Sequence, residues 1–169
     1  MNVCVLGAGS WGTAIAILLA RNGHEVVLWG RDDEGIASLG TLRENIQYLP
    51  GFVLPESVHV AVGEEELNED DLWVIAVPSY AVRSVCARIV GESPRIAIAS
   101  KGLESATSML LADVVAEKKP NATIAAISGP NLALEIVRGM PTAAVAASNN
   151  LALAELVRDI FNCRTFRVY

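Results

Sequence analysis

Apolar runs alternate with helix-forming stretches along most of this chain. Apolar runs without internal alternation are typical of parallel strands that helices cover on both faces. Seven segments fit that description: Asn2–Leu6, Val26–Trp29, Val58–Val62, Leu72–Val77, Arg95–Ala99, Thr123–Ile127 and Thr142–Ala147. Helices are predicted at Thr13–Ala20, Glu34–Leu39, Ala81–Val90, Ser105–Lys118, Leu132–Val137 and Leu151–Phe161. This order predicts an α/β fold with a doubly wound, mostly parallel sheet and right-handed crossovers.

A glycine-rich turn joins the first predicted strand to the first predicted helix. It reads Gly7-Ala8-Gly9-Ser10-Trp11-Gly12, which has the spacing G-x-G-x-x-G. In such a turn the first glycine makes the tight turn, the second lets a pyrophosphate approach the backbone, and the third packs helix against strand. Amides at the helix start and the helix dipole favour an anion there. The pattern predicts a Rossmann-like, dinucleotide-binding domain, although flavin-binding proteins and methyltransferases use a related turn.

The end of the second predicted strand bears on the choice of nucleotide. An acidic side chain that holds the adenosine ribose is usual about 20 residues after the glycine turn. That position falls on or beside Arg31, with Asp32 next to it. A guanidinium can stack on adenine and pair with a ribose phosphate, which a carboxylate would repel. NADP is therefore allowed and NAD is not excluded, while a solvated turn would contain the same residues.

Composition and charge exclude several classes of protein. The 169 residues are 52% hydrophobic and 5% aromatic, so Ala, Val, Ile and Leu must build the core of what we expect to be a single domain, residues 1–169. The net charge is −6 and the basic residues are scattered, which argues against a nucleic-acid surface. Three distant cysteines predict neither a disulfide framework nor a metal site. Without a leader or a long apolar segment, we expect a cytoplasmic protein with no membrane span.

Distinctive residues follow three of the predicted strands. Pro78-Ser79 follows the fourth strand, Ser100-Lys101-Gly102 the fifth, and Ser128-Gly129-Pro130-Asn131 the sixth. Ligands of open α/β sheets lie beyond the carboxyl ends of the strands, so these residues should converge on one crevice. Lys101 can neutralise a phosphate there, and Asn131 can bond a substrate hydroxyl. An exposed turn lysine and a helix cap are the simpler alternatives.

Two aromatic residues are expected near the nucleotide. Trp11 is large for a phosphate loop, so it should cover the cofactor or close onto a neighbouring domain. Tyr48 belongs to Asn45–Gly51, an irregular segment whose Pro-Gly pair marks a turn. We expect Tyr48 at the rim of the adenine site, although a surface loop would look similar.

Several segments, taken together, resemble one family. They are Gly7–Ala14, Trp29–Arg31, Asn45 with Tyr48–Pro50, Val77–Ser79, Lys101–Glu104, Ser128–Ala133 with Glu135, and Gly139–Ala143. In this order, along nearly the whole chain, they resemble the NAD(P)-dependent glycerol-3-phosphate dehydrogenases of the bacterial type. The resemblance implies reversible hydride transfer between carbon 2 of sn-glycerol 3-phosphate and a nicotinamide. The keto product is dihydroxyacetone phosphate, and the reverse direction supplies glycerophospholipid biosynthesis.

The resemblance also implies roles for individual residues. Cofactor contacts fall on Ser10, Trp11, Arg31, Tyr48, Lys101 and Ala133, in addition to Gly7, Gly9, Gly12 and Pro78 from the glycine turn and the strand ends. Substrate contacts fall on Lys101, Gly129 and Asn131. The family often has threonine or serine where this chain has Asn131, which is a departure.

A second, helical domain is implied by the same resemblance. In the family that domain supplies the general-base lysine and the residues that grip the substrate phosphate, and its members are commonly dimeric. This sequence stops at Tyr169, so we expect no complete catalytic set in it, retained cofactor contacts and negligible turnover. Two alternatives stay open, namely another hydroxyacid or sugar-acid dehydrogenase on the same scaffold and a nucleotide-sensing module without chemistry.

Overall fold

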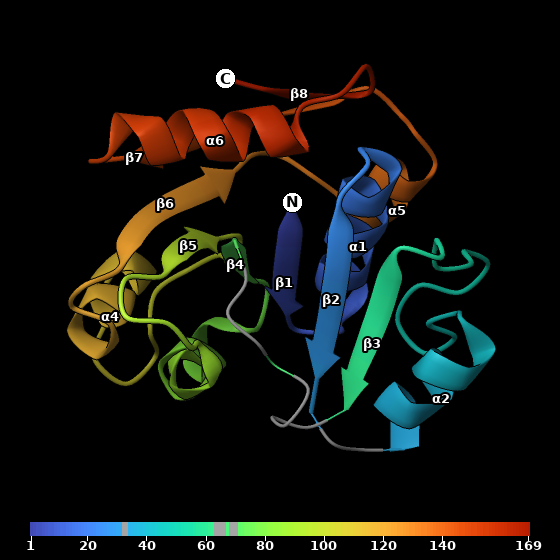
Figure 1. Ribbon diagram of the computed structural model, residues 1–169, viewed down its shortest axis with the longest axis horizontal. Helices are drawn as coiled ribbons and strands as arrows, with labels where there is room; N and C mark the ends of the chain where they lie inside the picture. The colour runs from blue at the N-terminus through green and yellow to red at the C-terminus, as the bar shows by residue number, and fades with distance from the viewer. Residues whose placement is uncertain (32–33, 63–66, 68–70) are drawn as a thin grey trace.

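The computed structural model describes residues 1–31, 34–62, 67 and 71–169. Within these residues one eight-stranded sheet has the order β3-β2-β1-β4-β5-β6-β7-β8 (Figure 1). The strands are β1 (Asn2–Leu6), β2 (Glu25–Gly30), β3 (Val58–Val62), β4 (Leu72–Ile75), β5 (Arg95–Ile98), β6 (Thr123–Ser128), β7 (Thr142–Ser148) and β8 (Phe166–Val168). The α/β fold and the mostly parallel sheet predicted from the sequence are confirmed.

Helices cover both faces of this sheet. They are α1 (Ser10–Arg21), α2 (Glu34–Leu42), α3 (Val82–Val85) between the 3₁₀ turns η1 (Ser79–Ala81) and η2 (Cys86–Arg88), α4 (Leu111–Lys118), α5 (Ala133–Val137) and α6 (Leu151–Phe161). In β1, Val3 and Val5 pack with α1 and its neighbours, whereas Cys4 and Leu6 pack with α3 and α4. Burial on both faces explains why β1 reads as an unbroken apolar run. No helix in the described part is long and apolar enough to cross a membrane.

Two predicted elements were wrong in detail. Helix α4 begins at Leu111, so the predicted helical residues Ser105–Leu110 form a loop instead. Serine and threonine side chains compete for hydrogen bonds with a helical backbone. Here the Thr107 hydroxyl donates to the Glu104 carboxylate, and Ser108 has a φ of 60° that no right-handed helix allows.

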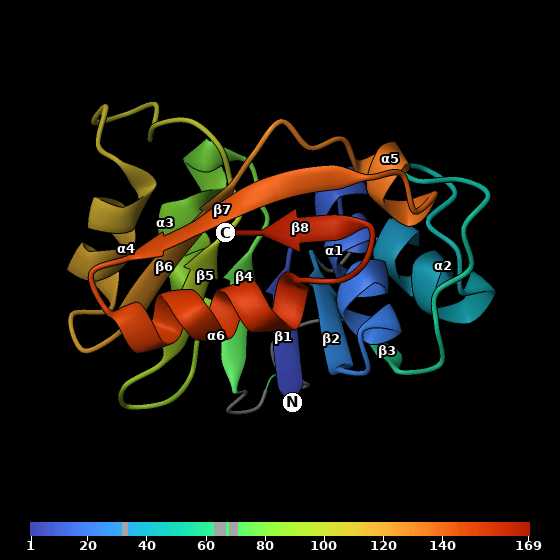
Figure 2. The same ribbon diagram turned by 90° about the horizontal axis from the view of Figure 1, so that it is seen from above.

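The other correction concerns β7, which runs antiparallel to β6 instead of continuing the crossovers. The connection contains α5, whose five residues span only about 8 Å. Such a helix cannot return the chain to the opposite end of the sheet, so β7 starts where β6 ends. Strand β8, which was not predicted, pairs with β7, and both lie along α6 (Figure 2).

The strand order contains a reversal that locates the ligand crevice. From β1 the chain moves to β2 and β3 on one side, and then crosses to β4, β5 and β6 on the other side of β1. Helices leaving the neighbouring strands β1 and β4 therefore turn to opposite faces and leave a gap at the carboxyl ends. The glycine turn follows β1 at this point, and Pro78 and η1 follow β4.

Candidate functional site

The three glycines of the first turn have different surroundings. Gly7 has a φ of 123°, a conformation that L side chains rarely adopt. At Gly12 an added Cβ would lie 1.7 Å from the Gly7 carbonyl oxygen, so only glycine lets α1 pack this closely. A Cβ on Gly9 would meet nothing within 4 Å. The protein's own backbone conformation and packing thus require glycine at positions 7 and 12. The space beside Gly9, in contrast, is open to a ligand.

The start of α1 is suited to bind an anion. Gly9 is the N-cap residue, no side chain caps the helix, and its first turn contains no acidic residue. The first amides of a helix have no acceptor within the helix, and its dipole is positive at this end. A pyrophosphate bound by these amides would occupy the open space at Gly9.

A cleft of about 360 Å³ extends from the glycine turn across the ends of β2 and β4. Its volume is within the range of small-molecule sites. Five residues expected to bind the cofactor line it: Gly7, Gly9, Arg31, Tyr48 and Pro78. Asp32, the alternative ribose ligand, lies outside the described residues.

Asn45 ties the segment containing Tyr48 to the glycine turn. Its side-chain nitrogen donates to the Ala8 carbonyl oxygen at 2.9 Å and to the Thr13 hydroxyl at 2.7 Å, and the residue is 5% exposed. Its side-chain oxygen accepts from the Tyr48 amide at 3.1 Å. Sequence reasoning placed Asn45 in the resemblance but gave it no role. The structure makes it the link between the loop after α2 and the phosphate turn.

Arg88 is a cleft residue that the sequence analysis missed. Its guanidinium carbon lies 5.4 Å from the centre of the Trp29 ring, at the end of β2 where Arg31 also lines the cleft. This distance is within the range of cation–π contacts. Arg88 lies in η2, 57 residues beyond Arg31 in the chain, so no local pattern could have paired them.

A second group of residues lies beside the cleft, at the ends of β5 and β6. The Trp11 indole nitrogen donates to the Ala99 carbonyl oxygen at 3.0 Å. The Lys101 ammonium donates to the Gly129 carbonyl oxygen at 3.1 Å and lies 5.7 Å from the centre of the Trp11 ring. Lys101 and Gly129, which follow β5 and β6, therefore converge as the sequence predicted, whereas the contact of the Trp11 indole with the lysine was not predicted.

The remaining predicted residues are further from open space. Gly12 is buried under the turn, and Ser10 and Ala133 are half-buried at the starts of α1 and α5. Asn131 is 7% exposed, and its amide nitrogen donates to the Thr142 hydroxyl and to the Ala143 carbonyl oxygen, each at 2.8 Å. Because β7 uses both amide hydrogens, a substrate contact by Asn131 would fall to its side-chain oxygen. The roles of these residues stay predictions.

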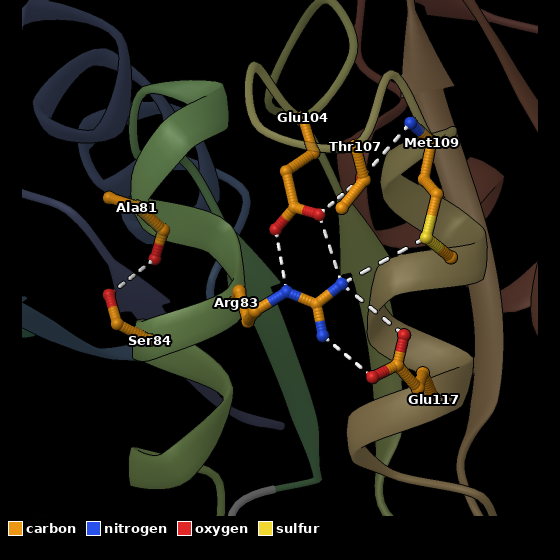
Figure 3. A network of polar contacts seen from close by, with 7 residues as sticks. All are labelled: Ala81, Arg83, Ser84, Glu104, Thr107, Met109 and Glu117. Carbon is orange, nitrogen blue, oxygen red and sulfur yellow. Dashed lines mark hydrogen bonds and ion pairs between the residues drawn. The ribbon is translucent and has the colours of Figure 1, made fainter.

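Arg83 of α3 and Glu104 form a partly buried ion pair, in which the Glu104 carboxylate is the buried partner (Figure 3). The guanidinium donates to both carboxylate oxygens, at 2.7 Å and 2.9 Å, and the Glu104 residue is 4% exposed. Hydrogen bonds from Arg83, and then from Thr107, hold the pKa of Glu104 at about 2, below its ordinary value of 4.5. No local pattern indicates this pair, because its members lie 21 residues apart, Arg83 on the short helix α3 and Glu104 on a loop.

We expect this ion pair to make the free energy of unfolding depend on pH in the acid range. A carboxyl whose pKa is lowered by folding stabilises the folded state above its unfolded pKa, and that contribution is lost as the pH falls from about 4.5 to about 2. Urea unfolding should therefore show a smaller loss of stability over this interval in Glu104→Gln than in the native chain. Equal losses in the two proteins would contradict the assignment.

Among the described residues, no group of three or more His, Cys, Asp or Glu side chains could hold a metal ion. In the described part of the chain, the cations Arg31 and Arg88 line the cleft, and Lys101 lies beside it at the end of β5. Anionic groups such as phosphates are their natural ligands. An open glycine, a helix start and cations at both ends of the site fit an extended dinucleotide with a second anion beside Lys101.

Comparison of the sequence with known proteins identifies a family. A model of the NAD-dependent glycerol-3-phosphate dehydrogenase N-terminus matches residues 2–154. The glycerol-3-phosphate dehydrogenase (NAD(P)+) of Clostridium acetobutylicum is 40% identical, over 99% of this chain and 52% of the relative. That of Parvibaculum lavamentivorans is 37% identical, over 99% of this chain and 51% of the relative.

The solved structures agree. The crystal structure of glycerol-3-phosphate dehydrogenase from Coxiella burnetii has a TM-score of 0.91 and 35% identity, covering 99% of this chain and 53% of that one. The Plasmodium falciparum structure has the same TM-score at 22% identity, which supports the fold alone. The chain spans about half the length of the relatives that it matches.

Proposed function

Because this chain belongs to the NAD-dependent glycerol-3-phosphate dehydrogenase N-terminus family, we propose that it is the nucleotide-binding half of such an enzyme. The reaction would interconvert sn-glycerol 3-phosphate and dihydroxyacetone phosphate with NAD(P)(H). The observation that carries the proposal is the cleft at the β1–β4 reversal, open at Gly9 and lined by Arg31, Tyr48 and Pro78. A free glycine above a helix start is the arrangement that pyrophosphate binding needs.

Different residues of this chain would bind different parts of the cofactor and the substrate. Amides at the start of α1 would hold the pyrophosphate, and Arg31 and Tyr48 would contact the adenosine side of the cleft. Lys101 would contact the substrate, because its ammonium can neutralise a phosphate or stabilise an oxygen that gains charge. The nicotinamide, when bound, accepts or donates the hydride. Positioning of this kind contributes roughly 7 to 11 kcal/mol to such reactions.

Removal of the hydroxyl proton would need a base close to the reacting carbon. We assign that group to the part of the relatives that the match does not cover, and accordingly expect this chain alone to turn over negligibly. The proposal includes a cytoplasmic location. It is supported by Cys4, Cys86 and Cys163, none of which forms a disulfide, since thiols persist in reducing compartments.

Titration of the chain with NADPH and with NADH, followed by nicotinamide fluorescence, tests the proposal. Both nucleotides should bind, and Arg31→Asp should shift the ratio of their dissociation constants toward NADH by about tenfold, since a carboxylate repels the ribose phosphate. Binding of neither nucleotide would overturn the proposed function. An unchanged ratio would remove only the role of Arg31.

A further inference from the structure

The loop that follows Lys101, residues 103–110, is closed around Glu104. The Glu104 amide donates to the Met109 carbonyl oxygen at 3.0 Å, and the Ser108 amide donates to the Glu104 carbonyl oxygen at 2.8 Å. Leu103 and Leu110 pair across the base of the loop. The Thr107 hydroxyl adds a bond to the carboxylate. Both the backbone and the side chain of Glu104 therefore fix this loop.

Arg83 anchors the loop to the wall of the nucleotide cleft. It lies on α3, whose neighbouring residues Ser84 and Val85 line the cleft. Its guanidinium points the other way and contacts two carboxylates, Glu104 in the loop and Glu117 on α4 (Figure 3). The two carboxylates differ in exposure, because the Glu104 side chain is 5% exposed and that of Glu117 is 53% exposed. Of the two ion pairs made by Arg83, the one with Glu104 is therefore the better shielded from solvent.

Lys101 lies only three residues before Glu104. The position of the lysine therefore depends on the ion pair between Glu104 and Arg83. Gly102, between them, has a φ of 94°, so the chain turns sharply there. The Lys101 ammonium then reaches across to the Gly129 carbonyl oxygen at the end of β6. A shift of the loop would draw the ammonium away from both Gly129 and the Trp11 ring.

We propose that Arg83 and Glu104 are positioning residues, which hold Lys101 at the carboxyl ends of β5 and β6 where the substrate anion would bind. The inference rests on the substrate role proposed for Lys101. Neither residue touches the expected ligands. Their effect is transmitted through the closed loop 103–110 and the turn at Gly102.

Competitive acetylation with acetic anhydride tests the inference on the native chain. The sequence has three lysines, Lys101, Lys118 and Lys119, so mass spectrometry separates Lys101 from the other two. The α-amine of Met1 serves as the internal standard. Glu104→Gln should raise the acetylation rate of Lys101 about fivefold, the size of effect that follows the loss of one typical hydrogen bond. Thr107→Val, a milder change to the same carboxylate, should give a smaller rise.

Glu117→Gln is the matched control. It removes a carboxylate that contacts the same guanidinium, but it leaves the loop 103–110 unchanged. It should leave the rate at Lys101 within about twofold of the native value. NADPH affinity of Glu117→Gln should also stay within about twofold of the native value, which shows that the control leaves the cleft intact. Equal rates at Lys101 in the native, Glu104→Gln and Thr107→Val chains would overturn the inference, as would an equal rise in Glu117→Gln. Failure of the native chain to bind NADPH would instead overturn the proposed function.

Discussion

Gly9→Ala should fold as stably as the native chain, to within about 1 kcal/mol, and lose about tenfold or more in affinity for NADPH. The backbone of Gly9 has a φ of −76°, which alanine adopts, and the added methyl group would meet no protein atom within 4 Å. It would instead occupy the space that a pyrophosphate needs above the amides of α1. Urea unfolding and fluorescence titration measure the two effects separately.

The control for this variant is Gly40→Ala. Gly40 lies in α2, where a methyl group would make ordinary contact with Val60 at 3.7 Å, outside the cleft. Its stability should equal or exceed that of the native chain, because alanine is favoured over glycine inside a helix. Its NADPH affinity should not change. Native affinity in Gly9→Ala would mean that the phosphates do not bind at this turn.

Gly12→Ala, unlike Gly9→Ala, should destabilise the fold. Its methyl group would lie 1.7 Å from the Gly7 carbonyl oxygen, a backbone atom that no side-chain rotation can move. Helix α1 would have to shift away from β1, at a cost of about 3 kcal/mol or more. Such a loss is a large fraction of the 5 to 15 kcal/mol that is typical of domain stability.

The measurement for Gly12→Ala is the midpoint of urea unfolding, followed by tryptophan fluorescence. Nucleotide affinity should also fall in this variant, as a consequence of the displaced helix. An unfolding free energy within about 1 kcal/mol of the native value would show that α1 can relax without cost, and would contradict the packing role of Gly12. Gly9→Ala separates the two effects, since only ligand binding should change there.

The strands and the glycine turn were predictable because their signals are local. An unbroken apolar run such as Leu72–Ile75 marks a strand buried on both faces, and the predicted Val58–Val62 and Leu151–Phe161 match β3 and α6. The residues after the strands were identified for the same reason, since a parallel sheet puts all carboxyl ends on one edge. Lys101 and Gly129 do meet there.

Other features depended on contacts between distant parts of the chain. Trp11 donates to a carbonyl oxygen 88 residues away, so its role beside Lys101 follows from the neighbouring positions of β4 and β5 and not from the turn sequence. The helix predicted at Ser105–Lys118 begins only at Leu111, and the loop before it contains Glu104, which pairs with Arg83 of α3. No periodicity within a segment encodes such a pair.

The sequence by itself determined the α/β fold, the strand–turn–helix around Gly9 and the residues at the strand ends. Each depends on hydrophobic burial or backbone conformation within a few consecutive residues. Only the tertiary structure decided the reversal of β7, the link from Asn45 to the glycine turn and the anchoring of the Lys101 loop by Arg83. Hydrogen bonds and ion pairs act over about 3 Å in space, and the packing of the whole sheet sets which residues come that close.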